Sequence, residues 1–218
     1  MSSGMGLAFW YSMSNDNRWE WRTFGTVFGP AEVQIRVGAT NTSEFEETYF
    51  VDGAAGLSVK TRSNLLCVKA LRQTDAFGLE HWVSLLKMPF PIDAATVRGV
   101  FARWGVANTQ PASSVRTPDA FVDLVATEAP RVTEWVVHKH RSVGELHHCL
   151  VEIADISVEG WPLRTIAVSS ETPDPVIALV RRLDLARFEN MSYVSLLKCI
   201  ARSQGATHRS VALKQMHA

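Results

Sequence analysis

The feature that most constrains the fold is an alternation of cationic and apolar side chains over residues 57–70. Lys60 and Arg62 occupy every second position of the segment LSVKTR, and the positions between them carry valine and threonine. After a Ser-Asn pair at 63–64 the alternation resumes, with Lys69 on one face and leucine, valine and alanine on the other. Because strand side chains point alternately to two faces, this pattern predicts a β-hairpin with one basic and one apolar face.

Two earlier segments alternate in the same way. In the segment RWEWR, the charged residues Arg18, Glu20 and Arg22 share one face and two tryptophans share the other. In the segment EVQIRV, Glu32 and Arg36 alternate with valine and isoleucine. Both patterns predict half-polar strands.

Later segments complete the expected secondary structure. Lys139 and Arg141 share one face of a strand expected at 132–141, and Glu152 belongs to a strand expected at 148–156. Helical spacing of apolar residues predicts the helices that follow. The remaining expectations are a strand at 164–171, helices at 93–105, 118–127, 173–185 and 191–202, a polar loop at 38–46, and a short helix or irregular segment at 78–87.

Several short motifs occur in the order found in one known family. The pair Tyr49-Phe50 and residues 59–62 (VKTR) and 67–69 (CVK) look like that family's D-x-Y-F, L-R-x-R and L-x-x-K segments. Residues 137–141 (VHKHR) look like its K-x-R strand, and residues 192–197 (SYVSLL) are similar to its closing S-Y-x-x-L-L helix. The chain thus resembles a divergent member of the CYTH superfamily, the triphosphate tunnel metalloenzymes.

The resemblance implies an α+β fold, namely an antiparallel β-barrel with helices packed outside, whose interior tunnel binds a triphosphate and a divalent metal ion. It implies a metal-dependent phosphohydrolase acting on inorganic triphosphate or polyphosphate, or on an organic triphosphate, with Mg²⁺ or Mn²⁺ as cofactor. The family's first strand reads E-x-E-x-K, whereas this chain has Arg18, Glu20 and Arg22 there. Ser169 and Ala154 stand where the family pattern has further carboxylates.

The candidate site residues are those whose side chains would face the tunnel. A polyphosphate needs several cations, since Arg offers paired donors and Lys a point charge, and hydrolysis needs a hard cation held by carboxylates. Glu20 and Glu152 are the candidate catalytic residues and, with Glu171, the candidate metal ligands. Tyr193 is expected to anchor the last helix rather than to contact ligand. The candidate phosphate-binding residues are Arg22, Arg36, Lys60, Arg62, Lys69, Lys139 and Arg141.

Three alternatives stay open at this point. The replaced carboxylates favour a tunnel that binds polyphosphate or another anion without catalysis. A class IV-type nucleotidyl cyclase is a further alternative, although no motif indicates a pocket for a base. Alternating lysines and arginines are also compatible with an ordinary solvated sheet face.

Charge and cysteine usage limit the partners and the compartment. The 22 basic and 22 acidic residues balance, which favours a small anionic, phosphate-containing ligand over nucleic acid. Three scattered cysteines predict a reducing, cytoplasmic location, and the apolar run at 7–11 is too short to span a membrane. A single domain is expected at 18–203, with a loose leader at 1–17 and a mobile tail at 204–218.

Overall fold

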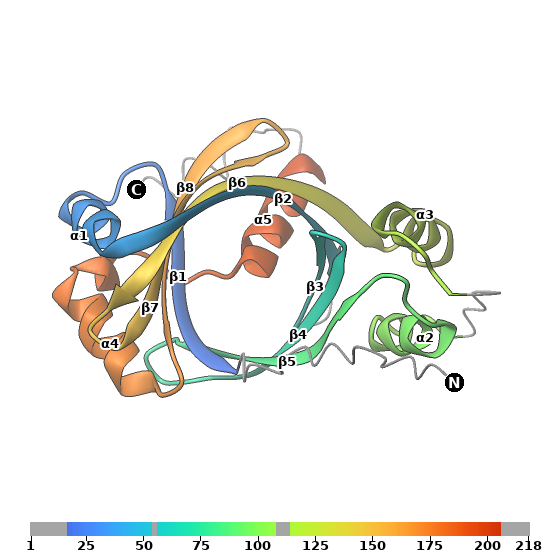
Figure 1. Cartoon of the computed structure of the whole chain (residues 1–218), viewed down its shortest axis with the longest axis horizontal. Coiled ribbons are helices and arrows are strands. Elements are labelled where there is room, and N and C mark those ends of the chain that lie inside the picture. The colour runs from blue at the N-terminus through green and yellow to red at the C-terminus, as the bar shows by residue number, and fades with distance from the viewer. Residues whose placement is uncertain (1–16, 54–55, 108–113, 206–218) are drawn as a thin grey trace, which may run out of the picture.

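The computed structural model describes residues 17–53, 56–107 and 114–205, and within them an eight-stranded antiparallel sheet closes into a barrel (Figure 1). The α+β barrel predicted from the sequence is therefore confirmed. Apart from residues 17, 204 and 205, the expected leader and tail lie outside the described residues. Around the barrel the strands are β1 (Arg18–Gly25), β5 (Glu80–Pro89), β4 (Leu65–Thr74), β3 (Leu57–Arg62), β2 (Ala39–Asp52), β6 (Val132–Leu146), β7 (Cys149–Val158) and β8 (Trp161–Ser170).

The predicted basic hairpin is formed by β3 and β4. Lys60 lies opposite Cys67 and Ser58 lies opposite Lys69, so the expected polar row occupies one face. The turn residues Ser63 and Asn64 have φ angles of 47° and 62°. Two consecutive positive φ angles are typical of a type I′ turn, whose twist matches that of the flanking strands.

The expected strand at 32–37 is wrong, because these residues belong to helix α1 (Pro30–Gly38). Pro30 suits the first turn of a helix, where its missing N–H is not needed. Ala31 and Ile35, four residues apart, are both buried in a cluster between α1 and the barrel. Tertiary packing thus overrides the period-two pattern and exposes Val33 and Val37 to solvent.

Two other secondary-structure predictions are also wrong, because both segments form strands that the sequence pattern did not indicate. The expected polar loop at 38–46 is the first half of β2, which pairs with β6 from Ala39 to Asp52. The expected helical or irregular segment at 78–87 lies mainly in β5. Register shifts in β4, between Val68 and Lys69 and between Leu71 and Gln73, offset the pairing of β4 with β5. Bulges of this kind blur strict alternation.

The predicted helices are confirmed, and four of the five α-helices found in the described residues pack outside the barrel. Helix α2 (Ala94–Arg103) begins at Asp93, whose carboxylate accepts a hydrogen bond from the backbone N–H of Thr96 at 2.9 Å. Helices α2 and α3 (Pro118–Glu128) form one apolar cluster with the sheet, and α1 and α4 (Pro173–Arg182) form another (Figure 1). A short 3-10 turn, η1 (Leu185–Arg187), follows α4. Among the described residues, no helix combines the length and the apolar character needed to cross a membrane.

Helix α5 (Tyr193–Gly205) occupies a different position. In the view along the barrel it lies across the opening (Figure 1). Its residues Val194, Leu196 and Leu197 are buried in a cluster with inward-facing residues of the strands, among them Phe24 and Trp135. One end of the barrel interior is therefore filled by an apolar plug, and the polar residues lie toward the other end.

Candidate anion-binding site

A cavity of about 120 Å³ lies inside the barrel, next to the plug. Its walls combine six cationic and three carboxylate side chains. A single water needs roughly 10–15 Å³ of such volume, so the cavity has room for several waters or a short anion. The lining residues are Glu20, Arg22, Glu47, Tyr49, Ser58, Lys60, Arg62, Lys69, Trp82, Lys139, Arg141, Glu152, Ser192, Tyr193 and Val194.

Six of the seven candidate phosphate-binding residues meet in this cavity, and Arg36 does not. Because residues 30–38 are helical, Arg36 lies on α1 outside the barrel. Its guanidinium instead forms an ion pair with Asp155 at 3.3 Å, and both side chains are about 40% exposed. The six that converge are Arg22, Lys60, Arg62, Lys69, Lys139 and Arg141.

The candidate acidic residues divide in the same way. Glu20 and Glu152 line the cavity. Glu171 does not, because β8 ends at Ser170 and the next residue is an exposed bend beyond the barrel wall. The parity argument placed Glu171 on the face of Ser169, but it applies only while the strand continues.

Glu47 is the most important site residue that the sequence analysis missed. Its side chain is 1% exposed and contacts Lys60 at 2.6 Å, Arg62 at 3.3 Å and Lys139. Burial alone raises the pKa of Glu47, but Lys60 and Lys139 outweigh that effect and hold the pKa well below its usual value. Its alternation with Tyr49 was a usable signal, which the assignment of the preceding residues to a loop obscured.

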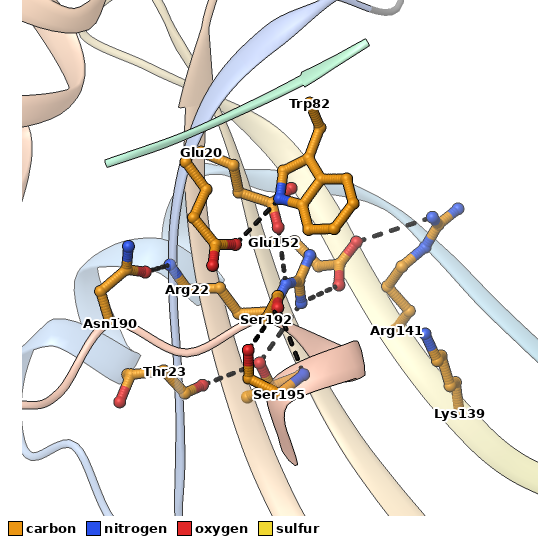
Figure 2. Close-up of polar contacts among 12 residues, drawn as sticks. Glu20, Arg22, Thr23, Trp82, Lys139, Arg141, Glu152, Asn190, Ser192 and Ser195 are labelled. Carbon is orange, nitrogen blue, oxygen red and sulfur yellow. Dashed lines mark hydrogen bonds and ion pairs between the residues drawn. The ribbon is translucent and has the colours of Figure 1, made fainter. Parts of the chain in front are cut away.

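Arg22 lies between the two other carboxylates (Figure 2). Its Nε donates to Glu20 Oε1 at 3.0 Å, and its Nη1 donates to Glu152 Oε1 at 2.9 Å. Burial lowers the pKa of Arg22, but the two carboxylates raise it by more than burial lowers it. The pKa of Arg22 therefore stands well above its ordinary value. The pKa of Glu152, raised by burial, ends below its usual value mainly because of Arg22 and Lys139.

Lys139 lies deepest among the cations. It is 4% exposed, donates to Tyr49 Oη at 3.1 Å, and lies 3.6 Å from the centroid of the Tyr193 ring. Burial lowers the pKa of Lys139 to about 7, and Glu47 opposes that shift. Tyr193 packs α5 against the barrel, as expected, and its ring also lines the cavity.

Two polar groups of the cavity have no hydrogen-bond partner among the described residues. They are the Nε of Arg141 and the hydroxyl of Tyr193, and both atoms are buried. Buried polar groups are normally paired, so each of these groups lacks a partner that a bound ligand or water would supply. Both can donate, which suits an anionic ligand.

Arg62 and Arg141 lie at a partly exposed part of the cavity. Their side chains are 25% and 26% exposed, in contrast to the buried Glu47 and Lys139. Both guanidinium groups lie over the ring of Phe45, at 5.1 and 4.9 Å from its centroid. These two arginines are therefore accessible to an anion from solvent, whereas Lys139 is buried.

The carboxylates of this cavity do not fit a divalent ion as they stand. Glu20 and Glu152 already accept hydrogen bonds from Arg22, and Glu47 is paired with three cations. Ser169, at a position where a carboxylate was expected, lies directly opposite Glu20 in the register of β1 and β8. Within the described part of the chain, no group of three His, Cys, Asp or Glu side chains is arranged to hold a metal ion.

Among known proteins, the comparisons find similarity only to the folds of solved structures. No protein-family model and no curated protein matches the chain. Its structure is similar to PH1012 from Pyrococcus horikoshii OT3 (17% identity, TM-score 0.44, 76% of this chain and 90% of that one). It is also similar to PH1819 from the same organism (14% identity, TM-score 0.44, 82% of this chain and 97% of that one). A third similar structure is the putative adenylyl cyclase HpAC1 from Hippeastrum, described as revealing a dominant triphosphatase activity (12% identity, TM-score 0.46, 86% of this chain and 96% of that one).

Proposed function

We propose that the barrel cavity binds an extended phosphate-containing anion, either inorganic triphosphate or polyphosphate or an organic triphosphate. The observation that carries this proposal is the convergence of six cationic side chains and only three carboxylates on one cavity. The chain as a whole has no net charge, so this local surplus of three positive charges is a property of the site. An anion of several charges would neutralise it.

The types of donor also favour phosphate. Arg62 and Arg141 present planar groups of donors, and Lys60, Lys69 and Lys139 supply point charges. Charge-assisted bonds of both kinds are common in phosphate sites. The unpartnered Arg141 Nε and Tyr193 hydroxyl add two directed donors.

The cations lie at different depths, which favours an extended ligand over a single phosphate. Arg62 and Arg141 are partly exposed, whereas Lys139 is buried beside the plug. One orthophosphate cannot contact both levels as fully as a chain of phosphoryl groups. We therefore expect triphosphate to bind more tightly than pyrophosphate, and pyrophosphate more tightly than orthophosphate.

Calorimetric titration of the three ligands, in EDTA and at low salt, tests this proposal. Binding should weaken as salt rises, because ions screen the attraction. Lys60→Met should weaken triphosphate binding by about tenfold or more, a loss of about 1.4 kcal/mol. Arg36→Met, which removes a cation outside the cavity, is the matched control and should bind as the unmodified protein does. Equal affinity for the three ligands, or no binding, would contradict the proposal.

Metal-dependent hydrolysis of the same ligands is the second candidate. It is favoured by the position of Glu20 and Glu152, which both face the cavity as the CYTH resemblance implies. Release of orthophosphate from triphosphate, ATP or long-chain polyphosphate, with Mg²⁺ or Mn²⁺, measures it directly. If it occurs, Glu20→Gln should abolish release and leave metal-free binding intact or stronger. Full activity of Glu20→Gln would show that this carboxylate is not a catalytic ligand.

A further inference from the structure

The guanidinium of Arg22 is held between two carboxylates of the cavity, Glu20 and Glu152 (Figure 2). We propose that Arg22 is the resident cation of this cavity: it fills the place that a divalent ion would need, and the anion therefore binds without metal. The second half of this inference rests on the proposed function, whereas the first half concerns the cavity alone.

The distances leave no place for an ion between these groups. Arg22 nitrogens lie 3.0 Å from Glu20 Oε1 and 2.9 Å from Glu152 Oε1. A divalent ion such as Mg²⁺ or Ca²⁺ would have to approach its oxygen ligands to roughly 2.0–2.6 Å. It would then stand within contact distance of a positive guanidinium, and the repulsion would be severe in a buried site. Arg22 and a bridging metal ion are thus mutually exclusive.

Arg22 is firmly held in this position. Its backbone N–H donates to Asn190 Oδ1 at 2.7 Å, and its Nη1 is 3.3 Å from the Thr165 hydroxyl. The guanidinium also lies 4.9 Å from the centroid of the Tyr193 ring. With 7% exposure, the side chain has little space to move aside, and a guanidinium does not lose its proton at ordinary pH.

Neither the second oxygen of Glu152 nor the nearby carboxylate of Glu80 provides another place for a metal ion. Glu152 Oε2 is 3.6 Å from Arg141, so this carboxylate faces two arginines. Glu80 lies opposite Glu20 in the register of β1 and β5, but it accepts a hydrogen bond from the Trp82 indole at 2.9 Å.

A built-in cation changes what dissolved Mg²⁺ should do. A metal-requiring site binds the ligand as its metal complex, and EDTA abolishes binding. Here the protein supplies the counter-charge itself, so the free anion is the better ligand. Magnesium bound to triphosphate lowers its charge, and we expect excess Mg²⁺ to weaken binding to the cavity.

The first arm of the test measures Mn²⁺ binding by electron paramagnetic resonance, without any anion. The unmodified protein should leave the Mn²⁺ signal free. Arg22→Met should free Glu20 and Glu152 and bind Mn²⁺ at least about tenfold more tightly, because carboxylate charge sets the affinity of such sites. The double variant Arg22→Met/Glu152→Gln should lose this gain. Arg36→Met, which also removes an arginine from a carboxylate, is the matched control and should not bind Mn²⁺.

The second arm uses the unmodified protein and so does not depend on the folding of any variant. Triphosphate should bind equally well in EDTA and in metal-free buffer, and less well in excess Mg²⁺. Three results would each overturn the inference: loss of triphosphate binding in EDTA, Mn²⁺ binding by the unmodified protein that Glu20→Gln removes, or a folded Arg22→Met variant that gains no Mn²⁺ affinity. Absence of triphosphate binding in every buffer refutes the proposed function instead, and the Mn²⁺ titrations then still decide the role of Arg22.

Discussion

The two ends of the barrel interior are built from the same strands but have opposite chemistry. On β6, Trp135 and Val137 face the plug, and two and four positions further along the same face carry Lys139 and Arg141. On β1 the change runs from Phe24 to Arg22 and Glu20, and on β7 from Ile156 to Glu152. Each strand thus keeps its inward parity and changes only its residue type.

This contrast explains how the charged end is held together. The plug excludes water from one side of Glu47 and Lys139, which lowers the local dielectric and strengthens the attraction between charges. The same burial makes any unpaired charge costly. The apolar end should therefore tolerate changes in salt and ligand, whereas the stability of the charged end should depend on them.

The largest effect is expected from Glu47→Gln, because it leaves three cations without their shared counter-ion. Loss of one partner of a buried pair costs about 3–5 kcal/mol, and the lower figure applies here because Lys60 and Arg62 are partly exposed. Chemical denaturation measures the loss. Glu46→Gln, an adjacent and exposed glutamate paired with His138, is the control and should change stability little. Added triphosphate should restore much of the lost stability; failure to do so would argue against the proposed ligand.

The substitution Leu197→Ala, in the plug, is the counterpart of Glu47→Gln at the apolar end of the barrel. Leu197 is fully buried in the apolar end, and removal of a buried leucine side chain costs about 2–5 kcal/mol. Unlike the loss caused by Glu47→Gln, this loss should be the same with and without triphosphate, because a change in the plug leaves the triphosphate affinity of the cavity as it was. Selective rescue by the anion would mean that the two ends are not separate in energy.

The next effect is a pH dependence that arises from Lys139. Its amine is protonated below pH 7 and loses its proton as the pH rises through its pKa of about 7. Triphosphate affinity should therefore fall by about tenfold across this range, or about 1.4 kcal/mol. Lys139→Arg keeps a permanent charge, and the difference between the two proteins separates this effect from titration of the ligand. Parallel pH profiles for both would exclude Lys139 as the cause.

The same pKa also predicts a stability change with a defined sign. The unfolded amine titrates near 10.5 and the folded one near 7, so between these values the unfolded state binds more protons. Lys139 therefore makes stability rise with pH in this window. Denaturation midpoints of Lys139→Met should lack this contribution.

The smallest effect is expected from Ser169→Glu, which adds a carboxylate opposite Glu20. With Arg22 in place, we expect Mn²⁺ binding to stay weak, because the one added charge must still oppose the guanidinium. In the Arg22→Met background the gain should be larger. Mn²⁺ titration of both proteins measures the difference, and equal gains would mean that Arg22 does not repel the ion.

The charged face of the barrel could be predicted from the sequence because parity is a local property. Lys60, Arg62 and Lys69 belong to a hairpin whose alternation and turn are both visible in the residues. Lys139 and Arg141 were found by the same argument. The pairing of β3 with β4 is regular through the hairpin residues, and the register shift at Lys69 affects only the pairing of β4 with β5, so the inward face could be counted correctly.

The misassignments have equally specific causes. Arg36 was placed in the site because a helix with valines at 33 and 37 imitates strand alternation. Glu171 was included because the end of β8 is set by the barrel and not by the local sequence. Glu47 was overlooked because its strand begins in polar residues that are stabilised by pairing with β6, far along the chain. The pairing that makes residues 39–46 a strand is not visible in their own sequence, so the alternation of Glu47 with Tyr49 was not extended backwards.

The plug formed by α5 has a consequence for ligands of different length. Since α5 fills one end of the barrel, we expect a phosphate chain to enter from the partly exposed side of the cavity, end first. A linear polymer then offers the same number of docking points whatever its length, and a ring offers none. Saturation should follow the molar concentration of chain termini, and cyclic phosphates should compete poorly with linear ones of equal charge.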